Sequence, residues 1–560
     1  MTRNTALRGG AALSVLLMAA MGAPAEAKAA HHRHRALAAQ ESSSQGALRD
    51  EVRELKAQVD ALQTWRESQA ASQAQSDAQL QQVRAQLADT QAREQAAEAQ
   101  LQTRIQTIPG DVRTAVAAAA PRTDKLYVKG VTLTLGGFVE AASIYRSNNM
   151  EADIASNFNA IPYGANAVGH THELRFTARQ SRITALVQGD VNPTIHLAGY
   201  GEFDFQSAAQ TANSNQTNSY NPRIRQLYTT IDWDTEGGGW HFLAGQNWSL
   251  AVMNTKGITP RNELTPPQID AQYVPGFVFT RQPQFRVAYD WDKHLWVALS
   301  LENPQTTFFT SGKYNAGVSP LISGPAGSGF NAANTLSLNH VPDVIGKVAL
   351  EENLSGHSLH LEAFGIYRDL YERLNSSGTI ANNDTAAGGV GGGAVLAVVP
   401  KVLDVQVSAL YGAGIGRYGA AGLPDATLGV DGTLHPIREL DLLAGATWHV
   451  NPKLDLYAFA GEEREEETAF TAGTVFNGLG NPNYVNSGCA TEGSSACVGA
   501  TRYIDQATVG FWHKPYQGAF GRFQWGVQYS YTERHAFAGV GGAPSASENT
   551  LFTSFRYYPF

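Results

Sequence analysis

The stretch that decides the fold reads Ile195-His196-Leu197-Ala198-Gly199-Tyr200-Gly201-Glu202-Phe203-Asp204-Phe205-Gln206. In an extended chain, successive side chains point to opposite faces. One face of this stretch is therefore apolar and the other is polar; the apolar set is Ile195, Leu197, Phe203 and Phe205, and the polar set is His196, Tyr200, Glu202 and Asp204. This period of two predicts a strand with one face in apolar surroundings and the other in water.

About sixteen such segments follow one another from residue 131 to residue 560, and they begin near residues 131, 170, 194, 222, 239, 277, 294, 341, 357, 388, 401, 436, 453, 500, 519 and 548. Their joins alternate between seven short turns, such as Asp292-Lys293, and eight long polar loops, such as residues 251–276 and 303–340. Alternating short and long connections and an even number of strands predict an all-β transmembrane barrel of about 16 antiparallel strands. Both ends of the barrel chain are then on the side of the short turns. A barrel of this size has an aqueous lumen.

The residues before the barrel are expected to form four segments. Residues 1–27 read as a signal peptide, because basic Arg3 and Arg8 precede an apolar stretch too short to span a membrane and small residues follow it. Residues 28–46 form a basic flexible tail, for which contact with metal, lipid phosphate or the cell wall is the alternative to simple solvation. Residues 47–108 predict a coiled-coil helix, because apolar residues recur in a heptad pattern, and a single solvated helix is the alternative. Residues 109–130 are a linker to the barrel domain, residues 131–560.

The composition excludes some classes of function. A net charge of −9 argues against a nucleic-acid partner. After the N-terminus, no apolar run is long enough for a membrane helix. The sequence contains no Gly-x-Ser-x-Gly elbow and no zinc-like ligand spacing, so we expect no enzyme activity, no catalytic residue, no metal site and no cofactor.

The two cysteines, Cys489 and Cys497, are separated by a small, flexible stretch. An exported chain reaches an oxidising compartment in which a disulfide persists. The spacing is not Cys-x-x-Cys, so we predict a loop staple rather than a redox site.

Charged residues on the polar face of the strands are expected to line the lumen, because lipid penalises charge at mid-depth by about 2–4 kcal/mol. The predicted pore-lining residues are Arg175, Arg179, Arg182, Glu202, Asp204, Arg225, Asp232 and Arg286. Opposed basic and acidic walls would set the ion preference; ion pairs between neighbouring strands with only a structural role are the alternative. Arg223 and Arg225 share parity with apolar Leu227, so they reach the lumen only through a bulge or a rim position.

The third long loop, residues 251–276, combines charge with proline, which stiffens a loop by fixing φ. A stiff loop that folds inward would narrow the lumen, whereas an outward rim loop is the alternative. The predicted constriction-loop residues are Lys256, Arg261, Glu263 and Asp270.

The last segment ends in Ser554-Phe555-Arg556-Tyr557-Tyr558-Pro559-Phe560. We expect Tyr558 and Phe560 to share the lipid-facing side. On that interpretation, Arg556 and Ser554 occupy positions that should be apolar, so closure of the first strand on the last is the prediction that the sequence supports least.

Six stretches in the first six strands resemble the DcaP-like trimeric porins of Gram-negative outer membranes; they are residues 136–145, 178–182, 201–205, 223–228, 244–249 and 281–286. The N-terminal coiled coil also resembles that family. The resemblance implies a sixteen-stranded homotrimer that passes small, often anionic, solutes.

These observations together predict an outer-membrane porin that forms a water-filled diffusion channel for small hydrophilic, anionic solutes. Its expected partners are outer-membrane lipid, two further copies of the chain and the solutes, with the N-terminal segment in the periplasm. The alternative is a structural anchor, whose periplasmic coiled coil tethers the barrel to the cell wall.

Overall fold

The computed structural model describes residues 81–100, 125–207, 220–324 and 336–560, and the single positions 53, 56, 64, 67 and 79. The chain divides into two compact units, Met1–Ala120 and Pro121–Phe560. In the first unit, residues 81–100 are helical and exposed. The predicted signal peptide and basic tail, and most of the predicted coiled coil and linker, lie outside the described residues. None of the described helices has the length and apolar character needed to cross a membrane.

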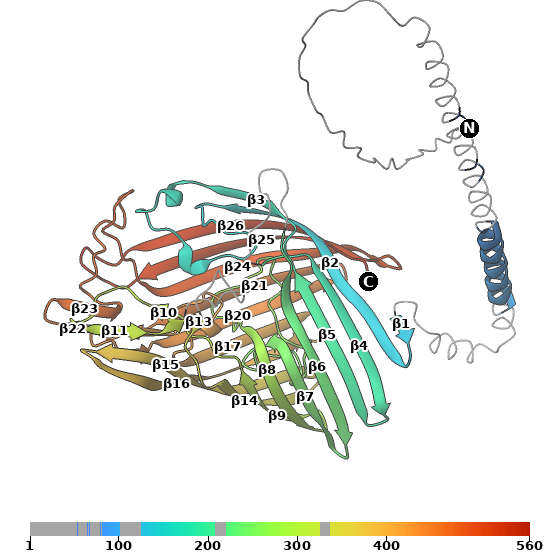
Figure 1. The fold of residues 1–560 in the computed structure, drawn as a ribbon, viewed down its shortest axis with the longest axis horizontal. Helices are drawn as coiled ribbons and strands as arrows, with labels where there is room; N and C mark the ends of the chain where they lie inside the picture. Colours follow the sequence, from blue (N-terminus) through green and yellow to red (C-terminus); the bar gives the residue numbers. More distant parts are fainter. Residues whose placement is uncertain are drawn as a thin grey trace, which may run out of the picture. The chain divides into compact units, whose positions relative to one another are not determined.

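The second unit is a closed antiparallel β-barrel (Figure 1). Its sheet contains nineteen strands. Two of these, β1 (Lys125–Val128) and β11 (Val318–Leu321), are short additions, and β3 and β4 together form one interrupted strand beside β2. The barrel wall therefore consists of sixteen strands. In chain order the barrel strands are β2 (Val131–Arg146), β3 (Glu173–Thr177) with β4 (Arg182–Asn192), β5 (Ile195–Asp204), β6 (Arg223–Thr235), β7 (Gly238–Trp248), β8 (Arg281–Trp291), β9 (Leu295–Glu302), β14 (Asp343–Leu354), β15 (His357–Ser376), β16 (Thr379–Val399), β17 (Leu403–Ala413), β20 (Arg438–Asn451), β21 (Leu454–Glu465), β24 (Thr501–Gly518), β25 (Gly521–Ala536) and β26 (Ser545–Tyr558).

The long loops carry the remaining described elements. These are η1 (Phe158–Ala160), η2 (Ala167–His170), β10 (Phe308–Phe309), β12 (Ser323–Gly324), β13 (Leu336–Ser337), η3 (Gly416–Tyr418), β18 (Ala426–Leu428), β19 (Leu434–Pro436), β22 (Thr468–Ala472) and β23 (Val475–Leu479). In addition, β1 occupies the end of the predicted linker and forms a hairpin with β2.

The sixteen predicted strands are confirmed, and the largest difference in position concerns β16. This strand begins at Thr379 rather than near residue 388, because β15 and β16 continue beyond the other strands as a long hairpin. Ser377 and Gly378 join them, with φ values of 52° and 93°. Positive φ at both positions is the geometry of a tight two-residue hairpin turn. One of the eight predicted long loops is therefore a short turn.

The two faces of the barrel strands differ as the period of two predicts. Large apolar side chains cover the outer face; Val139, Phe176 and Phe285 are 63%, 77% and 72% exposed. Alternate residues, such as Glu140 and Arg146, are buried on the inner face. Polar side chains therefore point into the barrel.

The seam between β2 and β26 closes the barrel over eight residue pairs, from Val139 opposite Tyr557 to Arg146 opposite Thr550. Phe555 and Tyr557 are exposed on the outer face, whereas Arg556 is 8% exposed and faces inward. Tyr558 follows Arg556 in parity and lies 5.2 Å from the ring of inward-facing Phe138. The expectation that Tyr558 faces lipid was therefore wrong, because Tyr558 faces the interior and its neighbour Tyr557 faces outward. Arg556 lies on the inner face, where a polar side chain is expected.

The third long loop, residues 251–276, lies inside the barrel. Its apolar side chains pack in one buried cluster with inner-face residues from strands around the wall; the loop members include Ile258, Ile269 and Val274, and the wall members include Ile144, Trp296, Phe364, Phe459 and Trp512. Backbone N–H groups of the loop also donate to wall side chains, for example Ile269 to Gln528 Oε1 at 2.6 Å and Asn254 to Glu362 Oε1 at 3.0 Å. The loop therefore folds inward rather than outward at the rim, and we call residues 251–276 the inner loop.

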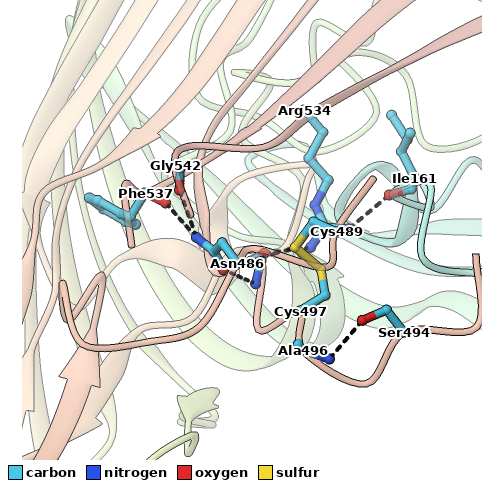
Figure 2. The surroundings of a disulfide bond; sticks show 10 residues. Ile161, Asn486, Cys489, Ser494, Ala496, Cys497, Arg534, Phe537 and Gly542 are labelled. Atoms are coloured by element: carbon cyan, nitrogen blue, oxygen red, sulfur yellow. Dashed lines mark hydrogen bonds between the residues drawn. A yellow bond between two sulfur atoms is a disulfide. The ribbon is translucent and has the colours of Figure 1, made fainter. Parts of the chain in front are cut away.

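A disulfide bond joins Cys489 to Cys497 in the loop between β23 and β24 (Figure 2). Asn486 fixes this loop to the loop between β25 and β26, because its side-chain amide donates to the carbonyls of Phe537 and Gly542 at 3.1 and 3.2 Å. The disulfide therefore closes a short loop that is tied to its neighbour.

Candidate functional site

Two interruptions in the strands turn neighbouring arginines toward the lumen. In an uninterrupted strand, Arg179 and Arg182 would point to opposite faces, because they are three residues apart. The chain makes a turn between β3 and β4, so both face inward. In β6, Glu202 pairs with Gln226 and Phe203 with Ile224, which leaves Arg225 as an extra, bulged residue. A bulge re-aims side chains in this way, and it resolves the parity problem of Arg223 and Arg225.

Four arginines gather around two carboxylates, and we call them the arginine cluster: Arg182, Arg223, Arg225 and Arg281. Arg225 pairs with both carboxylates, at 2.5 Å from Glu202 and 3.1 Å from Asp204. Arg223 binds Asp204 with two nitrogens, at 2.9 and 2.6 Å, and Arg182 lies 3.8 Å from Glu202. Both carboxylates therefore have cationic partners within the cluster.

Arg281 is the cluster member without a carboxylate. Its guanidinium stacks over the rings of Trp248 and Phe279 at 4.7 and 5.3 Å, and its buried Nη1 has no hydrogen-bond partner among the described residues. It also lies close enough to the other three arginines for mutual repulsion. With four cations and two anions, the cluster carries two excess positive charges.

The other predicted pore-lining residues also face inward, near both ends of the strands. Arg175 is half-exposed and pairs with Glu173 at 2.6 Å. Arg179 donates to the carbonyls of Phe205 and Ser207 at 3.0 and 2.8 Å. These bonds hold its cationic head beside the break between β3 and β4.

Asp232 lies toward the turn end of β6. One ring nitrogen of His241 contacts Asp232 at 2.7 Å and the other contacts Asp290 at 3.0 Å. Arg286 is 6% exposed, and it donates to Gln284 Oε1 and to the carbonyl of Trp248. Asp232 and Arg286 thus serve contacts within the wall.

The four charged residues of the inner loop differ in their surroundings. Lys256 and Arg261 are exposed, and Arg261 donates to the Tyr228 hydroxyl at 3.3 Å. Asp270 is 1% exposed and accepts from the backbone N–H of Ser156 at 3.1 Å, so it holds two loops together. Burial raises the pKa of the carboxyls of Glu263 and Asp270.

Sequence reasoning missed an acidic group on the far wall. We call Glu439, Asp441, Glu463 and Glu465 the acidic quartet; they lie on the inner face of β20 and β21. The signal was available, because the members alternate with other residues within each strand. These strands are the twelfth and thirteenth of sixteen, and the arginine cluster occupies the second, fourth and sixth, so the two groups lie about half a turn apart.

No family model matches the sequence, and no curated protein matches it significantly. Among solved structures, the outer-membrane channel DcaP of Acinetobacter baumannii superposes with a TM-score of 0.52 at 18% identity, over 77% of this chain and 99% of that chain. An anion-selective porin from Comamonas acidovorans gives a TM-score of 0.39 at 10% identity, over 76% of this chain and 99% of that chain. OmpF of Salmonella typhi in complex with daunomycin gives 0.41 at 10% identity, over 78% and 99% of the two chains.

The last two TM-scores lie below 0.5, so the assignment of the fold rests on DcaP. The resemblance noted in the first six strands is confirmed at the level of the fold. The chain has the sixteen-stranded porin fold of the DcaP outer-membrane channel.

Proposed function

We propose that the protein is an outer-membrane porin, and that its barrel forms a water-filled diffusion channel for small hydrophilic, anionic solutes. The porin fold supports a channel, and the charges on the inner wall support the preference for anions. No step of chemistry is required of the protein, because rings of charge select ions by attraction and repulsion alone.

The observation that carries this proposal is the excess of two positive charges in the arginine cluster. Arg223, whose side chain is 35% exposed, presents part of that charge to solvent. Two unit charges 4 Å apart attract by about 4 kcal/mol at an effective dielectric constant of 20. An anion that passes along this wall is therefore stabilised.

The inner loop and the acidic quartet strengthen the asymmetry. Exposed Lys256 and Arg261 add positive charge to the loop. The quartet lies on the opposite wall, so the negative charge that it retains after a cation or protons bind repels anions toward the arginines.

Swelling of proteoliposomes tests the substrate class. We expect a small dicarboxylate to enter faster than a neutral sugar of similar size, and an organic cation to enter more slowly. The double variant R223Q/R281Q should remove the preference. The matched control is R373Q, because Arg373 is exposed on the β15–β16 hairpin and pairs with Asn382. Equal entry of anion and cation into wild-type liposomes would refute the anion preference.

The assembly that we propose is a homotrimer with its N-terminal segment in the periplasm. In planar bilayers, the conductance of each inserted assembly should fall in three equal closing steps. Single closing steps would contradict a trimer.

A tethering role for the N-terminal segment is a second proposal, which rests on the exposed helix of residues 81–100 in a separate unit. Deletion of residues 31–110 tests it in cells. Loss of envelope integrity with unchanged solute uptake would support tethering, whereas intact envelopes would refute it.

A further inference from the structure

Strand register brings the acidic quartet together as two facing pairs. Glu439 lies opposite Glu465, and Asp441 lies opposite Glu463, on the inner face of β20 and β21. All four side chains are at most 2% exposed. Four carboxylates are therefore buried side by side near the loop end of the barrel.

The quartet has no cationic partner among the residues that the structure describes. The six carboxylate oxygens of Glu439, Asp441 and Glu465 are buried and accept no hydrogen bond from an N–H or O–H group of the described residues. Among the described residues, no Lys, Arg or His side chain forms an ion pair with a member of the quartet, and residues 208–219 and 325–335 contain none of these residue types. Buried carboxylates need either a cation or protons.

The arrangement of oxygens suits a calcium-sized ion. Glu439, Asp441 and Glu463 each offer a carboxylate oxygen, and these atoms lie within 4.8 Å of one another. Ca²⁺ accepts several carboxylate ligands at about 2.3–2.6 Å, whereas Mg²⁺ usually keeps several waters and binds through one or two carboxylates, so three buried carboxylates favour Ca²⁺. Glu465 is outside this group of three, and its two buried oxygens also accept no hydrogen bond from the described residues, which independently indicates that this wall requires a cation or protons.

Two glycines, at the start of η3 and directly after it, let the backbone approach the quartet. A Cβ atom at Gly416 would lie 2.9 Å from Glu439 Oε2, and one at Gly419 would collide with the carboxylate of Glu463. The segment therefore fits against the carboxylates only because it has no side chains at these two positions.

We propose that Glu439, Asp441 and Glu463 bind a divalent cation of the calcium class, with Glu465 as the neighbouring fourth carboxylate. The sequence predicted no metal site, because its ligands come in pairs from two strands rather than from one local motif. Binding of Ca²⁺ would reduce the charge of this wall by two units.

The site also connects the wall to two loops. Glu463 accepts from the backbone N–H of Gly276 at 2.8 Å and from that of Ala421 at 2.9 Å. An ion on Glu463 would therefore stabilise the end of the inner loop as well as the barrel wall.

Calcium titration of the full-length protein tests the proposal. Protein refolded from inclusion bodies into detergent avoids lipopolysaccharide, which itself binds Ca²⁺. After treatment with EDTA, Ca²⁺ binding is measured by calorimetry, and terbium luminescence gives a second readout. We expect one saturable site per chain, a higher unfolding temperature with Ca²⁺, and a weaker effect of Mg²⁺.

The variants E439Q and D441N should each weaken binding at least tenfold, and both keep the volume of the side chain. E462Q is the matched control, because Glu462 lies one residue away on β21 but pairs with Arg464 on the outer face. Absence of Ca²⁺ binding to the wild type, together with unchanged or raised stability of D441N, would show that protons neutralise the quartet and would overturn the proposal. Unchanged affinity in both variants would also overturn it.

Discussion

Arg556 Nε donates to Glu140 Oε1 over 2.9 Å, across the seam at which the last strand closes on the first. The two residues face each other in the register of β26 and β2. Both are buried on the inner face, at 8% and 2% exposure. The last strand thus places its charge inside the barrel, where Glu140 neutralises it.

Removing one partner of this pair should weaken closure of the barrel. E140A leaves the guanidinium of Arg556 buried without its carboxylate, which costs about 3–5 kcal/mol for a buried pair. The temperature at which the heat-modifiable band unfolds in SDS gels should fall. The double variant E140M/R556M should recover most of the loss, and a single variant as stable as the wild type would contradict an energetic role for the pair.

The inner loop depends on the absence of a side chain at Gly461. A Cβ atom there would collide with the carbonyl oxygen of Pro275 and lie 2.9 Å from that of Leu442. We expect G461A to push the inner loop away from β21 and to change single-channel conductance and its noise. G199A is the control, because nothing lies within 4 Å of the added atom; identical traces for all three proteins would refute this packing.

The disulfide should protect its loop from cleavage. Closing a loop of this length stabilises the folded form by about 2–3 kcal/mol in the chain-entropy estimate. Reduction, or the variant C489S/C497S, should therefore speed proteolysis after exposed Glu492 at least tenfold. The barrel strands should stay intact on the same gel, and equal cleavage of the oxidised and reduced loops would count against the staple.

The exposed apolar residues of the first unit should mediate assembly. Val83 and Leu87 are 59% and 58% exposed on the helix of residues 81–100, one turn apart. In a coiled coil they would be buried by the partner helices. V83D/L87D should lower the temperature at which trimers dissociate, with Q86E as a control on the same helix; no change would favour the solvated single helix.

The strand positions could be predicted because lipid on one side and water on the other force a period of two. The exceptions have local causes. The first part of β16, from Thr379, extends beyond the barrel wall and has no lipid against it. Its apolar and polar residues therefore alternate only weakly. The parity of the last strand was misread because Tyr558 packs inward on Phe138.

The candidate site was predicted in its basic half only. Arg182 and Arg225 stand out as charges beside apolar strand residues, but the bulge that turns Arg225 inward depends on pairing with β5. The acidic quartet left a signal that was missed, because its members alternate along two neighbouring strands. The path of the inner loop depends on contacts between distant segments, such as that of Gly276 with Glu463. A single sequence does not encode these contacts in a local pattern.

The reversal potential of the wild-type channel under a KCl gradient decides whether the barrel prefers anions. We expect a potential whose sign shows preferential passage of Cl⁻, and a shift toward preference for K⁺ in R223Q/R281Q but not in R373Q. A wild-type channel that prefers K⁺, or a folded protein that conducts no ions, would contradict the proposed function.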